Sequence, residues 1–455
     1  MDIAGKKILI VGLAKTGRAA ARFLLERGAR VTISERKRED ELGPAAAELA
    51  ARGAVLETGG HVLDSFLAAD LIVPSPGVPD IPELRAARAK GVPILSEVEI
   101  AFRFLKGTIV GITGSNGKTT TTTLAALILK RAGLRARPAG NIDVPLIAFA
   151  GTSRPSDVYV TELSSFQLQH TQLFRARVAA FLNLSLNHLD WHASFEEYYE
   201  AKKKLFARQA PGDTAVLNRE DARTWALAEG SPSRVLGFSS RRRLRAGCFL
   251  EDGWIVLRDG KERRVVRAGR VPLPGAHNLG NVMAACLIGH ALGAPAEAMR
   301  SAVRAFRGIE HRLEPVLSLR RVRFVNDSKA TTVDATLKAL QSFPGPIVLL
   351  LGGKDKGGDF RLLRREMRAR VRTVVLIGDS KDKIRKGIEG AAPAIETGSM
   401  REAVVRGFEA ARPGDVVLLA PACASFDWFK NYEERGRVFK REVRALDRRL
   451  GEERA

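Results

Sequence analysis

The amino-acid sequence predicts an α/β protein of three domains built on mostly parallel sheets. Its 455 residues correspond to roughly three domains of about 150 residues each. Short apolar runs alternate with longer helical patterns along nearly the whole chain, which is typical of βαβ units with parallel strands. Two strand–glycine turn–helix units begin at Ile8 and Ile109, so one domain is expected to end before the second unit starts.

Nine apolar runs are predicted as β-strands, because most are bounded by Gly, Pro, Asp or Asn. They cover residues 8–11, 31–33, 71–73, 109–112, 158–160, 179–182, 347–351, 374–377 and 416–419. Between about Thr214 and Pro272 the pattern is polar and strand-like, which we interpret as an antiparallel excursion of the central domain. The arginines at 241–243 are expected at a solvated hairpin tip within it.

The domain boundaries follow from these elements. We expect domains at 1–96, 97–308 and 309–455, because a third set of strands begins around Phe324, after an Arg-rich segment. The tail from Tyr432 to Ala455 is predicted as a charged amphipathic helix packed on its own domain. Its apolar stripe consists of Phe439, Val443 and Leu446, at positions i, i+4 and i+7.

Composition excludes several classes of protein. An apolar share of 45% and a charged share of 27% exclude a disordered chain, a collagen-like fibre and a small disulfide scaffold. Three distant cysteines without a CxxC motif indicate neither a disulfide framework nor a zinc ribbon. The formal charge of +23 permits nucleic acid, an acidic membrane surface or small polyanionic substrates as partners, without choosing among them.

Nothing in the sequence predicts secretion or a membrane span. The first apolar run leads into a glycine turn and not into a small-residue cleavage site. No stretch reaches the ~18 uncharged apolar residues that a spanning helix needs. We therefore expect a cytoplasmic protein, and we expect it to be a monomer.

The most informative segment is IVGITGSNGKTTTTTLAALIL, at residues 109–129. A strand, a glycine turn and a helix beginning Lys-Thr-Thr predict a phosphate-binding loop, in which backbone N–H groups face an anion. Lys118 adds a positive charge and the Thr119 hydroxyl can ligate Mg²⁺. The spacing departs from the general P-loop pattern, because Ile112 stands where that pattern needs glycine.

Two other functions are alternatives to nucleotide-driven chemistry. The first turn, residues 12–17, approaches the dinucleotide fingerprint and Glu35 ends the next strand, which favours an NAD-dependent dehydrogenase. Ala14 weakens that hypothesis, because its side chain would crowd a pyrophosphate. A nucleic-acid motor is disfavoured, because the strand after the phosphate loop ends in Glu162 without the usual aspartate, and no aromatic-interleaved basic patch appears.

A series of motifs runs along the chain in the order TGSNGKTTTT, ELSSFQL, NHLDWH followed by Tyr-x-x-x-Lys, PGAHNLGN, EHRLE, NDSKATT, LLGGKDKGGDF and APACASFDWFKNYEERG. Over essentially the whole chain this series resembles the Mur ligase family. The last motif is the most specific. The Asp-Asn-Pro-Arg string of the diaminopimelate-adding members is absent, and folylpolyglutamate synthases share only the phosphate loop. A sister ligase that adds another amino acid remains the alternative.

The resemblance implies an N-terminal Rossmann-like domain for a UDP-sugar, a central P-loop ATPase-like domain and a C-terminal Rossmann-like domain for an amino acid. It implies ATP-dependent addition of D-glutamate to UDP-N-acetylmuramoyl-L-alanine through an acyl phosphate, with ADP and phosphate released, in cytoplasmic peptidoglycan precursor synthesis. These small molecules are the expected partners, and no nucleic acid is expected. Two Mg²⁺ ions are the expected cofactors besides ATP.

The resemblance also implies roles for individual residues in catalysis and ATP binding. The implied catalytic residues are Lys118, Lys202, His188 and Arg312. The implied ATP-binding residues are Gly114, Ser115, Asn116, Gly117, Lys118, Thr119, Thr120, Asn278, Asn281, Arg312, Asp327 and Lys329. The implied metal ligands are Thr119, Glu162, His188 and Lys202, the last as a carbamate derived from CO₂. Lys203 has the same spacing to a tyrosine and stays open as the carbamylated residue, while His192 is expected at the surface or behind the ligands.

The substrate residues follow from the same resemblance. For the UDP-sugar they are Leu13, Lys15, Thr16, Glu35, Arg36, Ser75, Gly77 and Asn141. For D-glutamate they are Thr331, Lys356, Ser425, Phe426 and Tyr432. A lysine and a serine in this pocket favour an amino acid with two carboxylates.

Overall fold

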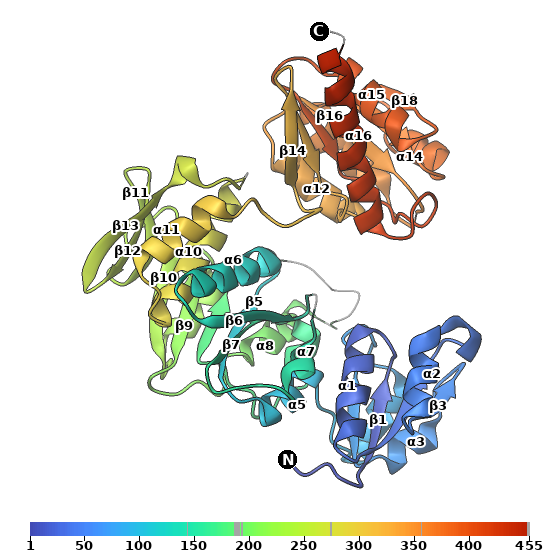
Figure 1. The fold of residues 1–455 in the computed structure, drawn as a ribbon, viewed down its shortest axis with the longest axis vertical. Helices are drawn as coiled ribbons and strands as arrows, with labels where there is room; N and C mark the ends of the chain where they lie inside the picture. The colour runs from blue at the N-terminus through green and yellow to red at the C-terminus, as the bar shows by residue number, and fades with distance from the viewer. Residues whose placement is uncertain (143, 186–191, 193, 274, 356, 453–455) are drawn as a thin grey trace. The chain divides into compact units, whose positions relative to one another are not determined.

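A computed structural model of the chain describes residues 1–142, 144–185, 192, 194–273, 275–355 and 357–452. Its described part contains three β-sheets with helices between the strands, which confirms the predicted α/β class (Figure 1). Contacts divide the chain into two compact units. The first consists of Met1–Val271 and His277–Ala305, and the second of Pro272–Ala276 and Phe306–Ala455. The domain boundaries at 96/97 and 308/309 stay predictions.

The first sheet contains four parallel strands. Their spatial order is β3 (Val55–Thr58), β2 (Arg30–Glu35), β1 (Lys7–Val11) and β4 (Leu71–Pro74). Its helices are α1 (Lys15–Glu26), η1 (Glu39–Glu41), α2 (Pro44–Ala51), α3 (Leu63–Ala68), α4 (Pro82–Ala89) and α5 (Glu97–Phe104). Because the strands are parallel, the segments after β1, β2 and β4 lie at one edge of the sheet, where ligands bind in such folds.

The second sheet contains nine strands. Their order is β13 (Lys261–Arg267), β12 (Trp254–Asp259), β11 (Gly247–Glu251), β10 (Arg234–Ser239), β9 (Thr214–Asn218), β8 (Val178–Phe181), β5 (Thr108–Thr113), β7 (Asp157–Glu162) and β6 (Arg135–Gly140). All neighbours from β6 to β11 pair in parallel, and β12 and β13 pair antiparallel. This sheet carries the phosphate loop at the end of β5.

The expected antiparallel excursion from Thr214 was wrong in its extent. β9, β10 and β11 continue the parallel sheet, and antiparallel pairing begins only with β12. The arginines at 241–243 are exposed as predicted, but they connect two parallel strands and therefore lie at no hairpin tip. The polarity of this region comes from the connecting segments and from β13, whose first four residues are exposed, whereas the interior of β9 is buried.

Helices follow the central strands as the sequence pattern predicts. They are α6 (Lys118–Arg131), η2 (Leu146–Phe149), α7 (Ser165–Gln169), α8 (Phe195–Lys203), α9 (Ala222–Trp225), η3 (Ala226–Ala228), η4 (Ala268–Arg270), α10 (Ala276–Ala291) and α11 (Ala296–Ala305). α6 contacts β5, β6, β7 and α11. Its side chains Leu124, Ile128 and Leu129 are fully buried, so the helix that carries the phosphate loop is anchored in the core.

The third sheet contains six strands. Their order is β14 (Glu314–Leu319), β15 (Val322–Asn326), β19 (Val416–Leu419), β16 (Ile347–Gly352), β17 (Val371–Ile377) and β18 (Ala394–Glu396). The sheet is parallel except for β14, an edge strand that the sequence analysis missed because its side chains are half-exposed. The helices are α12 (Val333–Gln341), η5 (Phe360–Leu363), α13 (Arg364–Arg370), α14 (Lys381–Gly387), α15 (Met400–Ala410) and α16 (Tyr432–Glu452).

The predicted packing of the C-terminal helix is confirmed. Phe439, Val443 and Leu446 of α16 are buried in the core of the C-terminal sheet. The cysteines Cys248, Cys286 and Cys423 are free and buried. Among the helices that the structure describes, none combines the length and the apolar character that crossing a membrane requires.

Candidate nucleotide-binding and ligase site

The phosphate loop has the backbone that its two glycines predict. Gly114 has φ +151° and Gly117 has φ +80°, a left-handed conformation that side chains rarely adopt. A β-carbon at Gly117 would collide with the side chain of Asn281 on α10. Position 117 therefore requires glycine, both for its positive φ and for the lack of space for a side chain. Because Gly117 is the N-cap of α6 and has no side chain, it leaves the first amides of the helix available to an anion.

The segment after β8, which contains Asn183, supports the phosphate loop through hydrogen bonds. Asn183 accepts a hydrogen bond from the Asn116 amide (2.9 Å) and its own amide group donates to the Asn116 carbonyl (3.1 Å). The Ser115 amide donates to the Asn183 carbonyl (2.9 Å). The Ser115 hydroxyl lies 3.1 Å from the hydroxyl of Tyr198 on α8. The loop is thus preorganised by residues that the sequence analysis did not single out, Asn183 above all.

Lys118 lies directly over the loop. Its ammonium donates to the carbonyls of Gly114 (2.8 Å) and Ser115 (3.1 Å). Both contacts are to backbone oxygens of the turn, so the charge stays beside the helix N-terminus. A phosphate bound to the loop would meet this ammonium together with the backbone amides.

Lys202 approaches the same loop from α8. It is 1% exposed, and its ammonium donates to the Gly114 carbonyl (3.1 Å) and the Thr113 hydroxyl (3.3 Å). Burial and the nearby charge of Lys118 lower the pKa of Lys202 well below its usual value, against the opposing charge of Glu162. Lys203 is exposed and pairs with Glu200 (3.1 Å). Of the two lysines with tyrosine spacing, only Lys202 therefore contacts the phosphate loop in the described part of the chain.

Glu162 ends β7 beside the loop strand. It is 3% exposed, and its Oε1 accepts a hydrogen bond from the Asn141 side chain (3.2 Å). Its Oε2 is buried without a hydrogen-bond partner among the described residues. A buried carboxylate oxygen in this condition fits a cation, and Mg²⁺ prefers such oxygens. The Glu162 carboxylate therefore suits Mg²⁺, and Thr119, the second residue of α6 after the phosphate loop, offers a hydroxyl of the kind that can complete such a site.

The segment NHLDWH is described only in part. His188 lies outside the described residues. His192 is 2% exposed, which excludes the surface position and leaves the expected position behind the ligands as a prediction. Its Nε2 lies 2.9 Å from the Ser165 hydroxyl, and its ring stacks on Phe166 at 5.4 Å. Apolar packing from α7 and α8 buries the ring, which lowers the pKa of His192 through desolvation.

Asn278 and Asn281 lie within the first turns of α10. The side-chain NH₂ group of Asn281 donates to the side-chain oxygen of Asn278 (2.9 Å), and both side chains are buried. They lie inside the helix that begins at Ala276, so neither is its N-cap. Asn281 also meets Gly117, which brings this pair to the phosphate loop.

The first glycine turn brings together the ends of three strands. The Leu13 amide donates to a carboxylate oxygen of Glu35 (2.7 Å), and the Ser75 hydroxyl donates to the Gly12 carbonyl (2.8 Å). A β-carbon at Gly17 would collide with the Gly12 carbonyl, so this helix must pack as closely as the fingerprint predicts. Of the other predicted residues here, Lys15, Arg36 and Gly77 are exposed, and Thr16 is half-buried.

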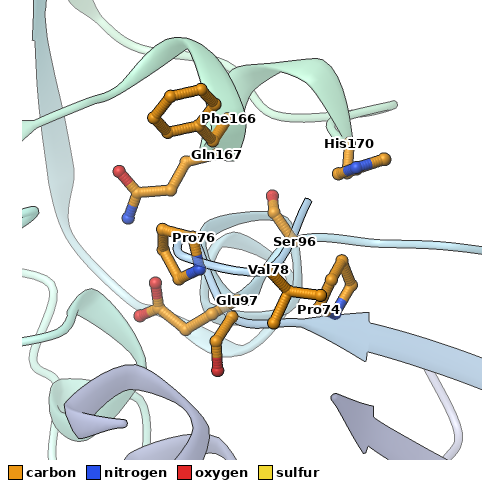
Figure 2. Close-up of a pocket in the computed structure, with 9 residues that line it drawn as sticks. Pro74, Pro76, Val78, Ser96, Glu97, Phe166, Gln167 and His170 are labelled. Carbon is orange, nitrogen blue, oxygen red and sulfur yellow. The ribbon is translucent and has the colours of Figure 1, made fainter. Parts of the chain in front are cut away.

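A small cavity lies behind this turn, between Pro76 and Val78 on one side and α7 on the other (Figure 2). Its volume of about 20 Å³ suits one water molecule and is far too small for a nucleotide. Glu97 lines it, and the Glu97 carboxylate accepts a hydrogen bond from the Ile147 amide (2.6 Å). Complete burial raises the pKa of Glu97 to about 7. This cavity is therefore distinct in scale from a substrate site.

The second unit holds the remaining predicted residues. Asp327 follows β15 and accepts a hydrogen bond from the Leu313 amide (3.2 Å); burial raises the pKa of Asp327 to about 7. Lys329 donates to the hydroxyl of Tyr432 (3.1 Å), and Arg312 is exposed. Within this unit, Asp327 therefore contacts the turn that carries Arg312. Lys329 contacts Tyr432.

The residues predicted for the amino acid are described unevenly. Ser425 is buried, Phe426 is 61% exposed and Thr331 is half-buried. Lys356 lies outside the described residues. Arg435 is a residue that the sequence analysis missed, although it lies within the last motif. It is 1% exposed and donates to the carbonyls of Cys423 and Ala424 (both 3.1 Å), immediately before Ser425.

Fold and site together define the class of α/β proteins that bind a nucleoside triphosphate at a glycine loop. Three family models match the chain: "Mur ligase MurD-like, N-terminal domain" at 6–96, "Mur ligase middle domain" at 112–289 and "Mur ligase, glutamate ligase domain" at 311–423. The chain therefore belongs to the Mur ligase family.

Similar proteins extend over the whole length. UDP-N-acetylmuramoylalanine--D-glutamate ligase of Acidobacterium capsulatum is 49% identical, over 97% of this chain and 96% of its own. The protein of the same name from Koribacter versatilis is 44% identical, over 98% of this chain and 99% of its own. The solved structure of UDP-N-acetylmuramate-alanine ligase MurC from Thermotoga maritima covers 97% of this chain and 100% of its own, at 21% identity and a TM-score of 0.57. That structure supports the fold alone.

Proposed function

We propose that the protein joins D-glutamate to UDP-N-acetylmuramoyl-L-alanine at the expense of ATP, in peptidoglycan precursor synthesis. The observation that carries the proposal is the buried Lys202 and Glu162 beside a phosphate loop, in a chain 49% identical to a ligase of that name. The protein acts as a cytoplasmic monomer on small-molecule substrates.

The reaction takes place in two steps. The terminal carboxylate of the UDP-sugar substrate attacks the γ-phosphorus of ATP, which forms an acyl phosphate and releases ADP. The amine of D-glutamate then attacks the acyl carbon, and inorganic phosphate leaves from the tetrahedral intermediate as the amide bond forms. All reactants are anionic, so cations must neutralise charge and align the reacting groups. Lys118 and the amides of α6 meet the terminal phosphates, and Arg312 meets the γ-phosphate.

Lys202 is carbamylated in the active protein. An ordinary lysine is a cation at neutral pH and cannot bind a metal ion. The lowered pKa of buried Lys202 raises the share of neutral amine that can react with CO₂. Its nitrogen attacks the carbon of CO₂, one C–N bond forms and a proton leaves, so a carbamate anion results. The exposed Lys203 has no such environment.

Two Mg²⁺ ions complete the site. The residues that would hold them are Thr119, Glu162, His188 and the carbamate on Lys202. Bound Mg²⁺ would neutralise phosphate charge. Glu162 Oε2 supports this role, because no described residue bonds to it and a buried carboxylate oxygen needs a cation or a donor.

Binding of the three substrates uses separate groups of residues. The ribose and adenine of ATP meet Asp327, Lys329, Asn278 and Asn281. The UDP-sugar binds at the first glycine turn, to Leu13, Lys15, Thr16, Glu35, Arg36, Ser75 and Gly77, with Asn141 holding its sugar-peptide arm. D-Glutamate meets Thr331, Lys356, Ser425, Phe426 and Tyr432.

The test is phosphate release from Mg-ATP with UDP-N-acetylmuramoyl-L-alanine, in parallel with D-glutamate, L-glutamate and no amino acid. We expect release only with D-glutamate, and a product heavier by one glutamyl residue by mass spectrometry. Equal release with L-glutamate would contradict the stereochemistry. Absence of release under all conditions, from folded protein that binds ATP, would overturn the proposal and favour a sister-ligase substrate.

A further inference from the structure

A cluster of charged groups supports the turn that carries Arg312. Glu310, His311 and Glu314 lie together, with one ligand-type atom of each within 4.8 Å of the others. The ammonium of Lys440, on α16, donates to Glu310 (2.6 Å) and Glu314 (2.9 Å). The position that a metal ion would take between these carboxylates therefore already has a cation of the chain itself.

The turn needs such support, because its backbone is strained. His311 has φ +65° and Leu313 has φ +43°, so both neighbours of Arg312 adopt the left-handed conformation. Neither is a glycine, and such residues keep this conformation only where surrounding contacts enforce it. The strain thus lies at the one segment that presents the Arg312 side chain.

Glu314 supplies one of the enforcing contacts. Its Oε2 accepts a hydrogen bond from the His311 amide (3.0 Å) and another from the Asn326 side chain (2.9 Å). Asn326 also lies 3.0 Å from His311 Nδ1. The Leu313 amide donates to Asp327, which we assign to the ribose of ATP. One carboxylate therefore connects the strained turn to the end of β15.

The other carboxylate oxygen of Glu314 accepts the hydrogen bond from Lys440 of α16. The Lys440 side chain is 13% exposed and that of Glu314 is 20% exposed, so water screens their interaction less than at an open surface. Burial alone would lower the pKa of Lys440, but hydrogen bonds to Glu310 and Glu314 raise it above its usual value. One turn earlier on α16, Gly436 meets His311 so closely that a β-carbon there would collide with the ring.

We infer that Lys440 is a positioning residue, which fixes Glu314 and through it the strained turn that presents Arg312 to the γ-phosphate. This inference rests on the proposed function, since it assigns the segment a role in ATP use. Removing the ammonium leaves Glu314 without its cation, and the turn then relaxes from the left-handed conformation. Arg312 loses its fixed position, whereas the residues around Ser425 and Phe426 keep theirs.

The test compares Lys440→Met, which keeps the aliphatic stem, with Lys440→Arg and with the control Lys338→Met. Lys338 pairs with Asp334 on the exposed face of α12 (2.6 Å), so the control removes an ion pair of the same unit away from the turn. We expect Lys440→Met to lower kcat/KM for Mg-ATP about tenfold, as a misplaced catalytic group does. The KM values for the UDP-sugar and D-glutamate should stay within about twofold, and Lys440→Arg should restore most of the loss.

A second readout does not need activity. Hydrogen exchange of the His311, Arg312 and Leu313 amides in the substrate-free protein should become at least about tenfold faster in Lys440→Met and stay unchanged in Lys338→Met. Faster exchange in a protein without ligase activity would overturn the proposed function and leave the supporting role of Lys440 intact. Unchanged exchange, or equal changes in all three KM values, would overturn the inference.

Discussion

The chain contains two strand–glycine turn–helix units with the same order of elements, but with different turns and different surroundings. At the first, the Leu13 amide already donates to Glu35, and Lys15 at the start of α1 is exposed. At the second, Lys118 and Lys202 both donate to carbonyls of the turn, and the carboxylate of Glu162 has a buried oxygen that finds no hydrogen-bond partner in the part of the chain that the structure describes. The backbone makes both turns suitable for phosphate, and only the second concentrates buried charge.

This difference shows how one order of strand, glycine turn and helix can bind two different ligands. A turn whose amide is satisfied by a carboxylate suits a ligand that donates hydrogen bonds, such as a nucleoside base or ribose. A turn flanked by two lysines and a buried carboxylate suits a triphosphate with metal ions. The side chains brought to the turn by distant segments, α8 and β7 here, therefore determine the chemistry.

The largest effect is expected when one of the two adjacent lysines, Lys202 and Lys203, is replaced. We expect Lys202→Ala to lower kcat by about 10²–10³-fold, because the site loses an anionic group that stabilises developing charge. Lys203→Ala, which removes an exposed pair with Glu200 and a ring contact with Tyr199, should stay within about twofold. Steady-state kinetics measures both, and ¹³C-bicarbonate labelling should give a carbamate signal that disappears only in Lys202→Ala. Equal losses in the two variants would contradict the assignment.

The second way is to neutralise one carboxylate at each turn. Glu162→Gln should lower kcat by about 10²-fold and leave the KM of the UDP-sugar unchanged. Glu35→Gln should raise that KM about tenfold and leave kcat unchanged, since a charge-assisted hydrogen bond is lost at the UDP-sugar site alone. Initial rates over both substrate concentrations separate the two effects. An exchange of the two patterns would reverse our assignment of the turns.

These assignments also show what the sequence can and cannot reveal. All nine predicted strands and the C-terminal helix were found, because burial on both faces leaves continuous apolar runs. The direction of β10 and β11 was missed, since a local pattern does not encode the partner of a strand. Spacing could not separate Lys202 from Lys203, whereas burial separates them at once.

Long-range contacts were the other part that the sequence could not reveal. Asn183 supports the phosphate loop from 67 residues away, and no local motif marks it. Lys440 contacts Glu310 from 130 residues away. Such contacts depend on how the sheets fold and therefore have no signature in the spacing of residues.

A third test concerns the segment between the two turns, where Glu97 is buried. Because burial raises the pKa of Glu97 from 4.5 to about 7, the folded state binds a proton that the unfolded state releases between these values. Stability from this group is present below pH 4.5 and is lost as the pH rises toward about 7. We expect Glu97→Gln to become more stable than the natural protein by about 2–3 kcal/mol as the pH is raised from 4.5 to 8. Urea unfolding at both pH values measures the difference, and a constant difference would contradict it.

The smallest expected effect concerns Lys15, the exposed cation of the first turn. We expect Lys15→Met to raise the KM of the UDP-sugar by no more than about threefold, because water screens an exposed charge. The increase should grow when the salt concentration is lowered. A loss as large as that of Lys202→Ala would mean that the first turn is a phosphate site of the same kind as the second.

Hydrogen exchange with each ligand in turn tests the central claim, that the two turns bind different ligands, most directly. We predict that UDP-N-acetylmuramoyl-L-alanine protects the amides of residues 12–17 and that Mg-ATP protects those of residues 114–120. Each ligand should leave the other turn unchanged. Protection of the first turn by ATP, or of the phosphate loop by the UDP-sugar alone, would contradict the account.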